Sequence, residues 1–339
     1  MFHLWAELPP LGGNKKEIYM FDSVKTGRDL IKQSFLVFRK YPKFIIPLII
    51  CWCFIALIIL YAKFIFPWGD YRWYAQLSFA FLVIFALSTI IGFSCLVLLQ
   101  LIKQVETGRE PNLGLAFSCA FYDDLIQAMP ILLIWAVCWF ILSVIQVLFT
   151  RKRDNENEKF TAENAAKVIA GMDYKWTLGN AFIESIKNGI RMIVFLILPA
   201  IAWEDKDPMD AIHSGFRVLR GQLKIFASGF VLTGMASATV FLPVALLLYI
   251  SEKGKITLPD EVWFGVILYS MLAWSFTFFI EQMYAAELYL WHMNWKKECD
   301  KAYKHNKPIP AFEEIKQPSI IDDVPDLIQT KVIKKSVAA

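Results

Sequence analysis

The sequence predicts an all-α fold, a polytopic transmembrane helix bundle of six spans with three interfacial amphipathic helices. Of the 339 residues, 57% are hydrophobic and only 19% are charged, which is typical of a chain whose solvent is largely lipid. A span needs roughly 20 apolar residues to cross about 30 Å of hydrocarbon. Runs of this kind lie at about residues 44–62, 75–102, 129–149, 223–250 and 262–280, and a less regular sixth run ends at Trp203.

Two basic amphipathic segments lead directly into apolar runs and resemble each other. Residues 29–44 read DLIKQSFLVFRKYPKF and residues 210–225 read DAIHSGFRVLRGQLKI. In both, apolar residues recur at i, i+4 and i+7, the pattern of a helix that lies in the membrane surface. A weaker third copy at residues 112–128 carries Asp123 and Asp124 where the other two carry Arg and Lys.

The three segments divide the chain into units, which favours an internal repeat. We expect a cytoplasmic segment at residues 1–27, a six-span membrane domain at 28–291 and a charged, partly disordered cytoplasmic tail at 292–339. The units cover about residues 28–102, 112–203 and 207–291.

The distribution of basic residues predicts how the chain is oriented. With six spans, 23 Lys and Arg residues fall on the side of the termini and 12 on the other side. This bias predicts a multi-pass protein of the plasma (inner) membrane with both termini in the cytoplasm. The third loop is an exception, because it is basic at residues 151–153. This distribution argues against a nucleic-acid partner, and the polybasic tail beside the inner leaflet predicts contact with the anionic lipids of the bilayer.

The fourth span is too short to cross alone, because only 12 residues up to Trp203 are continuously apolar. Its helix must begin earlier, within residues 179–191. There Glu184, Lys187, Asn188 and Arg191 fall at i, i+3, i+4 and i+7 and form one polar stripe. An inserted stripe would mark an ion or substrate path. We favour the alternative, a helix that lies flat in the outer headgroups with Glu184 and Lys187 as a solvated pair.

A second candidate site residue is Glu281, which ends the apolar run 262–280. We expect an interfacial acid near the inner headgroups, either hydrated or paired with a basic surface helix. The alternative is an embedded carboxylate that relays protons.

Four acids near the third surface helix resemble a metal cluster: Glu204, Asp205, Asp207 and Asp210. Asp207 precedes Pro208, and a carboxylate follows three positions on, which is the pattern of a helix start. We therefore expect capping and helix-dipole stabilisation, with metal ligation as the alternative.

Motifs that carry chemistry are absent from the sequence. The four histidines are scattered, and there is no HExxH, G-x-S-x-G or phosphate-binding glycine loop. Most of the six cysteines fall inside apolar runs and lack metal-ligand spacing. We therefore predict no catalytic, cofactor or metal site.

Several segments resemble a known family. SFLVFRKYPKFIIPLI, ETGREPNLGLAFSCAF, LPAIAWEDKDPMDAIHSGFRVLRG, YAAELYLW and NKPIPAF are similar to an uncharacterised family of six-span prokaryotic membrane proteins, over about residues 28–312. More loosely, the chain is similar to the group that includes the membrane domain of some glycerophosphoryl diester phosphodiesterases, without their catalytic domain. It departs from the family in its longer charged third loop and in the segment WKKECDKAYKH. The resemblance implies a six-span fold in a membrane and no particular activity.

The sequence favours a non-enzymatic structural, accessory or lipid-contacting membrane component, acting alone, as a homo-oligomer or with a membrane-protein partner. A small-solute or lipid transporter that uses the polar stripe is the alternative. A membrane-bound lipid enzyme is the third hypothesis, and it would need a metal ion bound by the acids of residues 204–210.

Overall fold

The computed structural model describes residues 36–67, 71–151, 178–254 and 259–315, and in these ranges every regular element is a helix. Short 3-10 turns cover Pro42–Phe44 and Phe312–Glu314, and π-helical turns cover Tyr61–Ile65 and Ala120–Asp124. The α-helices are α2 (Ile45–Leu60), α3 (Trp73–Glu106), α4 (Leu113–Cys119), α5 (Leu125–Arg151), α7 (Leu178–Glu204), α8 (Pro208–Gly221), α9 (Leu223–Gly254) and α10 (Asp260–Lys304).

Six helical segments in the described part of the chain are long and apolar enough to cross a membrane. This confirms the predicted all-α bundle with six spans and makes the chain a multi-pass membrane protein. The segments are Pro42–Leu60, Trp73–Glu106, Leu113–Gln146, Ala181–Glu204, Leu223–Ser251 and Asp260–Lys304.

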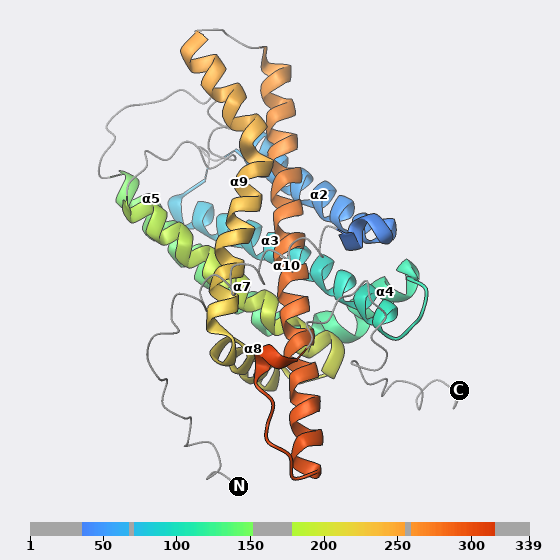
Figure 1. Cartoon of the computed structure of the whole chain (residues 1–339). Helices are drawn as coiled ribbons and strands as arrows, with labels where there is room; N and C mark the ends of the chain where they lie inside the picture. The colour runs from blue at the N-terminus through green and yellow to red at the C-terminus, as the bar shows by residue number, and fades with distance from the viewer. Residues whose placement is uncertain (1–35, 68–70, 152–177, 255–258, 316–339) are drawn as a thin grey trace.

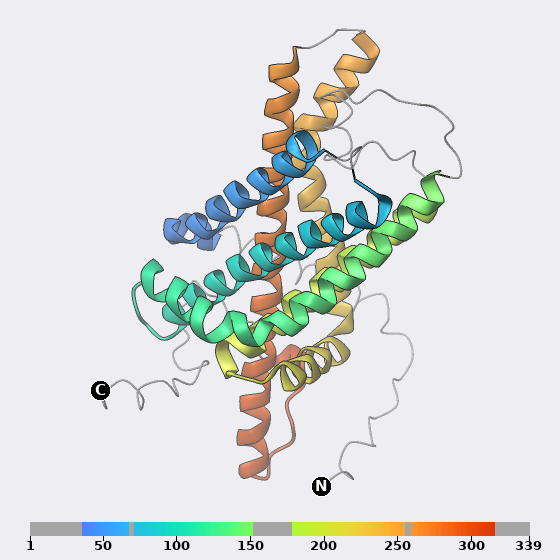
Figure 2. The same ribbon diagram turned by 180° about the vertical axis from the view of Figure 1, so that it is seen from behind.

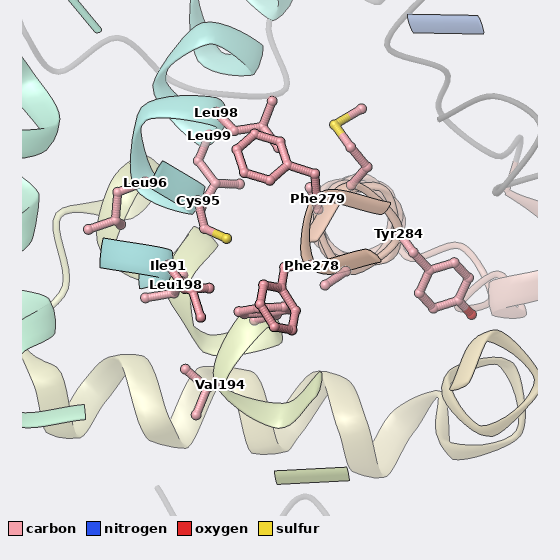
Figure 3. Packing of buried hydrophobic residues seen from close by; sticks show 14 of the residues in the cluster. Ile91, Cys95, Leu96, Leu98, Leu99, Val194, Leu198, Phe278, Phe279 and Tyr284 are labelled. Carbon is pink, nitrogen blue, oxygen red and sulfur yellow. The ribbon is translucent and has the colours of Figure 1, made fainter. Parts of the chain in front are cut away.

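α3 and α10 each contact several other helices of the bundle. α9 and α10 form a long hairpin, and α2, α3 and α5 run obliquely across it in both views (Figures 1 and 2). α10 contacts α2, α3, α7 and α9, and α3 contacts α2, α5 and α7. Figure 3 shows the centre of the resulting core, where Cys95 and Leu99 of α3 face Phe278 and Phe279 of α10. The core is therefore built mainly by α3, α7 and α10, whose span windows are also the most buried.

Close helix crossings depend on glycine. A Cβ atom at Gly229 of α9 would overlap the phenol ring of Tyr284, which points from α10 away from the Phe278 side of that helix (Figure 3). The Tyr284 hydroxyl donates a hydrogen bond to the carbonyl of Ile225 at 2.5 Å. Gly92 of α3 has the same role, because a Cβ there would overlap Leu132 of α5. Such positions let backbones approach closely in lipid.

The predicted third surface helix corresponds to α8, which packs against α7. It begins with Pro208 as its first residue and Asp207 at the N-cap, as predicted. The Asp207 carboxylate makes no capping hydrogen bond, so the prediction of side-chain capping is wrong. The helix ends at Gly221, and Gln222 separates it from α9.

The first unit is described only from residue 36, so the predicted start of its surface helix lies outside the described residues. Residues 36–40 are helical and are separated from the span by Tyr41, which aligns with Gln222 in the third unit. The aligned residues Val37 and Val218 are both buried. The two units thus share the position of the break and of this buried valine.

The second unit differs from the predicted pattern. α4 begins after Asn112, whose Oδ1 accepts a hydrogen bond from the Leu115 amide at 3.1 Å. It then continues through the π-helical turn Ala120–Asp124 into α5 without a break. No proline or glycine lies between Leu115 and Met129, so nothing in this stretch ends the helix. The expected separate surface helix is therefore the first part of a span.

Candidate functional site

The two site candidates from the sequence meet in space. Arg191 of α7 donates from Nε and Nη2 to the two carboxylate oxygens of Glu281 in α10, each at 2.6 Å. The side chains are only 16% and 5% exposed, and the guanidinium lies 4.9 Å from the centre of the Phe278 ring. This is the forked arrangement that arginine and carboxylate favour, with an added cation–π contact. The interface of α7 and α10 therefore contains a closed, nearly buried ion pair.

α7 is one continuous helix of 27 residues, about 40 Å long at 1.5 Å per residue. In the structure α7 begins at Leu178, one residue before the predicted range of 179–191. It packs against α3, α5, α8 and α10. The favoured flat helix in the outer headgroups is therefore not what forms, because this segment is part of a packed, span-length helix.

The rest of the polar stripe runs from the exposed start of α7 toward the ion pair. The Glu184 side chain is 54% exposed and lies 3.6 Å from Lys187. Lys187 also donates to Oε1 of Gln146 in α5, and Asn188 is half-buried. The expected pair of Glu184 and Lys187 is present, but Lys187 points partly into the bundle.

Glu281 differs from the prediction for an interfacial acid. Its carboxylate is neither hydrated at the surface nor paired with a surface helix, because Arg191 of α7 covers it. The two residues are 90 positions apart in the chain. Periodicity shows which face of its own helix a residue occupies, but it does not show which helix that face will meet.

A second polar cluster supplies hydrogen-bond donors to a backbone carbonyl at the end of α7. Nε2 of Gln100 donates to Asp124 at 2.6 Å and also lies 3.3 Å from the carbonyl of Ala202. Nζ of Lys103 donates to the same carbonyl at 2.8 Å. The last carbonyls of a helix have no partner within the helix, so these side chains supply one. The Asp124 carboxylate, predicted on a surface helix, is thus buried and used in packing.

The acids after Trp203 do not converge. Glu204 pairs with Lys206 at 2.8 Å and accepts a hydrogen bond from the Tyr289 hydroxyl. Asp205 occupies the turn with a φ of 48°. Within the described ranges, no group of three or more His, Cys, Asp or Glu side chains could hold a metal ion. The metal alternative, and the lipid enzyme that would need it, therefore gain no support from the geometry.

Sequence reasoning missed a basic cavity of about 550 Å³ beside this turn. It lies between the end of α7, the polar face of α8 and the last turns of α10, which occupy the same end of the molecule (Figure 1). Its lining includes Lys103, Arg217, Lys296 and the imidazole of His292. A signal was present, because lysines cluster at residues 296–304, but the sequence did not show that α8 would face them.

Comparison of the chain with protein-family models, with curated proteins and with solved structures finds no match in any of the three. The resemblance to a six-span prokaryotic family stays a prediction, and function must be argued from the site itself.

Proposed function

We propose that this chain is a non-enzymatic, lipid-contacting component of the plasma (inner) membrane, with a structural or accessory role and both termini in the cytoplasm. The observation that carries the proposal is the closure of the charged stripe on α7. Arg191 is held by Glu281, and Lys187 by Gln146 and Glu184. A substrate would have to break a bidentate, nearly buried ion pair, which is costly in a medium of low dielectric constant.

The apolar surface of the spans supports contact with lipid. Only 17% of the α9 span window is buried, against 61% for α10. On α9, Val231, Met235 and Leu242 are each more than half exposed. Faces of this kind suit acyl chains, and they also suit a membrane-protein partner or a second copy of the chain. The excess of basic residues on the side of the termini supports the cytoplasmic orientation.

A transporter is the second candidate, and a specific observation favours it. Glu287 of α10 is fully buried, and neither of its carboxylate oxygens has a hydrogen-bond partner in the part of the chain that the structure describes. Ionisable groups inside a helical bundle commonly mark ion or proton paths. Glu287 is a better candidate for such a path than the stripe on α7, whose charges are paired.

Two measurements on the same preparation test the proposal. The chain is extracted from native membranes with a bilayer-excising copolymer, and its lipids are compared by mass spectrometry with those of the bulk membrane. A lipid-contacting component retains a distinct lipid set after exchange into detergent. The purified chain is then reconstituted into vesicles that contain a pH-sensitive dye. Bulk lipid composition together with proton uptake that Glu287→Gln abolishes would overturn the proposal in favour of the transporter.

A further inference from the structure

The cavity beside α8 carries a strong excess of positive charge. Seven Lys and Arg side chains line it against three acids, and one of the seven, Lys301, is paired with Glu298 outside the lining, which leaves an excess of three positive charges. One of the acids, Glu204, is already paired with Lys206 and hydrogen-bonded by Tyr289. Like charges held around one concave space repel each other and raise the local concentration of anions. The lining is therefore more favourable with an anion present than without one.

Several of these cations are available to a ligand. Within the described residues, no carboxylate lies within ion-pair distance of Arg217, Lys296 or Lys304. Lys103 donates to the carbonyl of Ala202, and within the described residues no carboxylate lies within ion-pair distance of it. These side chains come from α3, α8 and α10, so the fold itself brings them to one place.

One residue of the cavity wall carries a buried nitrogen that lacks a partner. His292 is 8% exposed, and its Nδ1 has no hydrogen-bond partner among the residues that the structure describes. A buried polar atom without a partner costs free energy, but this nitrogen has essentially no accessible surface on the cavity, so a ligand there would not contact it in this arrangement.

The floor of the cavity is apolar and lies beside a surface helix. Trp203 and Tyr289 are buried there with ring centres 6.1 Å apart, and Val218 and Met293 add aliphatic surface. α8 exposes Met209 on another side, as expected of a helix at the level of the headgroups. The cavity volume of about 550 Å³ falls within the range of about 300–1,000 Å³ of ligand pockets.

We propose that this cavity binds a phosphate-bearing anion, with Arg217 and Lys296 as its principal cationic contacts. Arginine provides a fork that matches phosphate oxygens, and lysine provides a compact charge. The phosphate can be presented by the headgroup of an anionic lipid, and this form of the ligand rests on the lipid-contacting function proposed above. Free phosphate offers the same chemistry without that function. Basic pockets between helices on the cytoplasmic side bind anionic headgroups in this way.

The test uses the full-length chain in a neutral detergent and measures binding by native mass spectrometry and by thermal stabilisation. The probes are phosphatidylglycerol, phosphatidylcholine as the neutral lipid, and inorganic phosphate. The variant is Arg217→Gln with Lys296→Gln. The matched control is Arg39→Gln with Arg220→Gln, which removes the same charge from exposed residues outside the cavity, one of them on α8 itself.

We expect phosphatidylglycerol to bind better than phosphatidylcholine, and the cavity variant to weaken this binding by about tenfold, with less than about twofold change in the control. Competition by inorganic phosphate identifies phosphate as the recognised group. Stabilisation by phosphate alone, with no preference between the two lipids, assigns the site to free phosphate and contradicts the lipid form. Equal binding by variant and control overturns the proposal.

Failure of the cavity and failure of the proposed function give different results. If only the cavity assignment is wrong, the chain extracted from native membranes still retains a distinct lipid set, and the Arg217→Gln, Lys296→Gln variant retains the same set. If lipid contact itself is wrong, that set is missing from both the variant and the unmodified chain.

Discussion

Replacing the two members of the buried ion pair, singly and together, tests whether Arg191 and Glu281 act as one structural unit. The changes are Arg191→Met, Glu281→Leu and the double variant. The forked contact at 2.6 Å and the side-chain exposures of 16% and 5% place both charges largely out of water. Removing one partner leaves a buried charge without compensation, which costs about 3–5 kcal/mol. Replacing both with apolar residues of similar volume should be nearly neutral or stabilising.

The two single variants should not be equal. Glu281→Leu leaves a guanidinium, which keeps its charge at any accessible pH, beside the Phe278 ring. Arg191→Met leaves a carboxyl group that can take up a proton and become neutral. We therefore expect Glu281→Leu to lower the free energy of unfolding more than Arg191→Met does.

The assay is unfolding by sodium dodecyl sulfate in mixed micelles, followed by the fluorescence of the 12 tryptophans. The coupling energy is the difference between the double variant and the sum of the single variants. The control is the exposed pair Lys301 and Glu298, at 2.6 Å with side chains 55% and 38% exposed, whose removal should change stability by less than about 1 kcal/mol. Additive single effects at Arg191 and Glu281 would refute the reasoning.

Two further predictions concern packing between helices. Gly229→Ala should destabilise the chain by about 1–3 kcal/mol, because the added Cβ overlaps the Tyr284 ring. The control is Gly234→Ala in the same helix, where the added Cβ meets open space and should cost nothing. Equal unfolding midpoints for the two variants would show that α9 shifts freely. Trp203→Phe removes the hydrogen bond from the indole Nε1 to the carbonyl of Leu99 at 3.0 Å and should lower the unfolding free energy by at least about 1 kcal/mol, measured in the same micelles. A midpoint unchanged by Trp203→Phe would mean that the bond does not contribute.

The six spans could be predicted from the sequence because each needs only a local property, a long apolar run. The breaks before two of the spans were also local, since Pro42 follows Tyr41 and Gly221 precedes Gln222. The second unit has no such residue between Leu115 and Met129, and there the helix continues into the span. The absence of proline and glycine from this stretch indicated a continuous helix, but the comparison with the other two units favoured a separate surface helix.

The site could be predicted only in parts. The polar face of α7 and the acid at position 281 each stood out within their own helices, but their pairing depends on how α7 packs against α10. The basic cavity depends on still more of the fold, because α8 must turn its Arg217 toward the lysines of α10. Contacts between distant segments follow from tertiary packing, and the spacing of polar and apolar residues along a single helix does not reveal them.

The central claim is that the end of the molecule with the basic cavity faces the cytoplasm, and one labelling measurement tests it directly. Cys299 of α10 is half-buried near the lysines of the cavity and is expected in the cytoplasm. Intact spheroplasts are treated with a membrane-impermeant maleimide, and labelling of the Cys299 peptide is read by mass spectrometry before and after lysis. The proposed function predicts labelling of Cys299 only after lysis. Labelling in intact spheroplasts would place the basic cavity on the outer face and contradict the account.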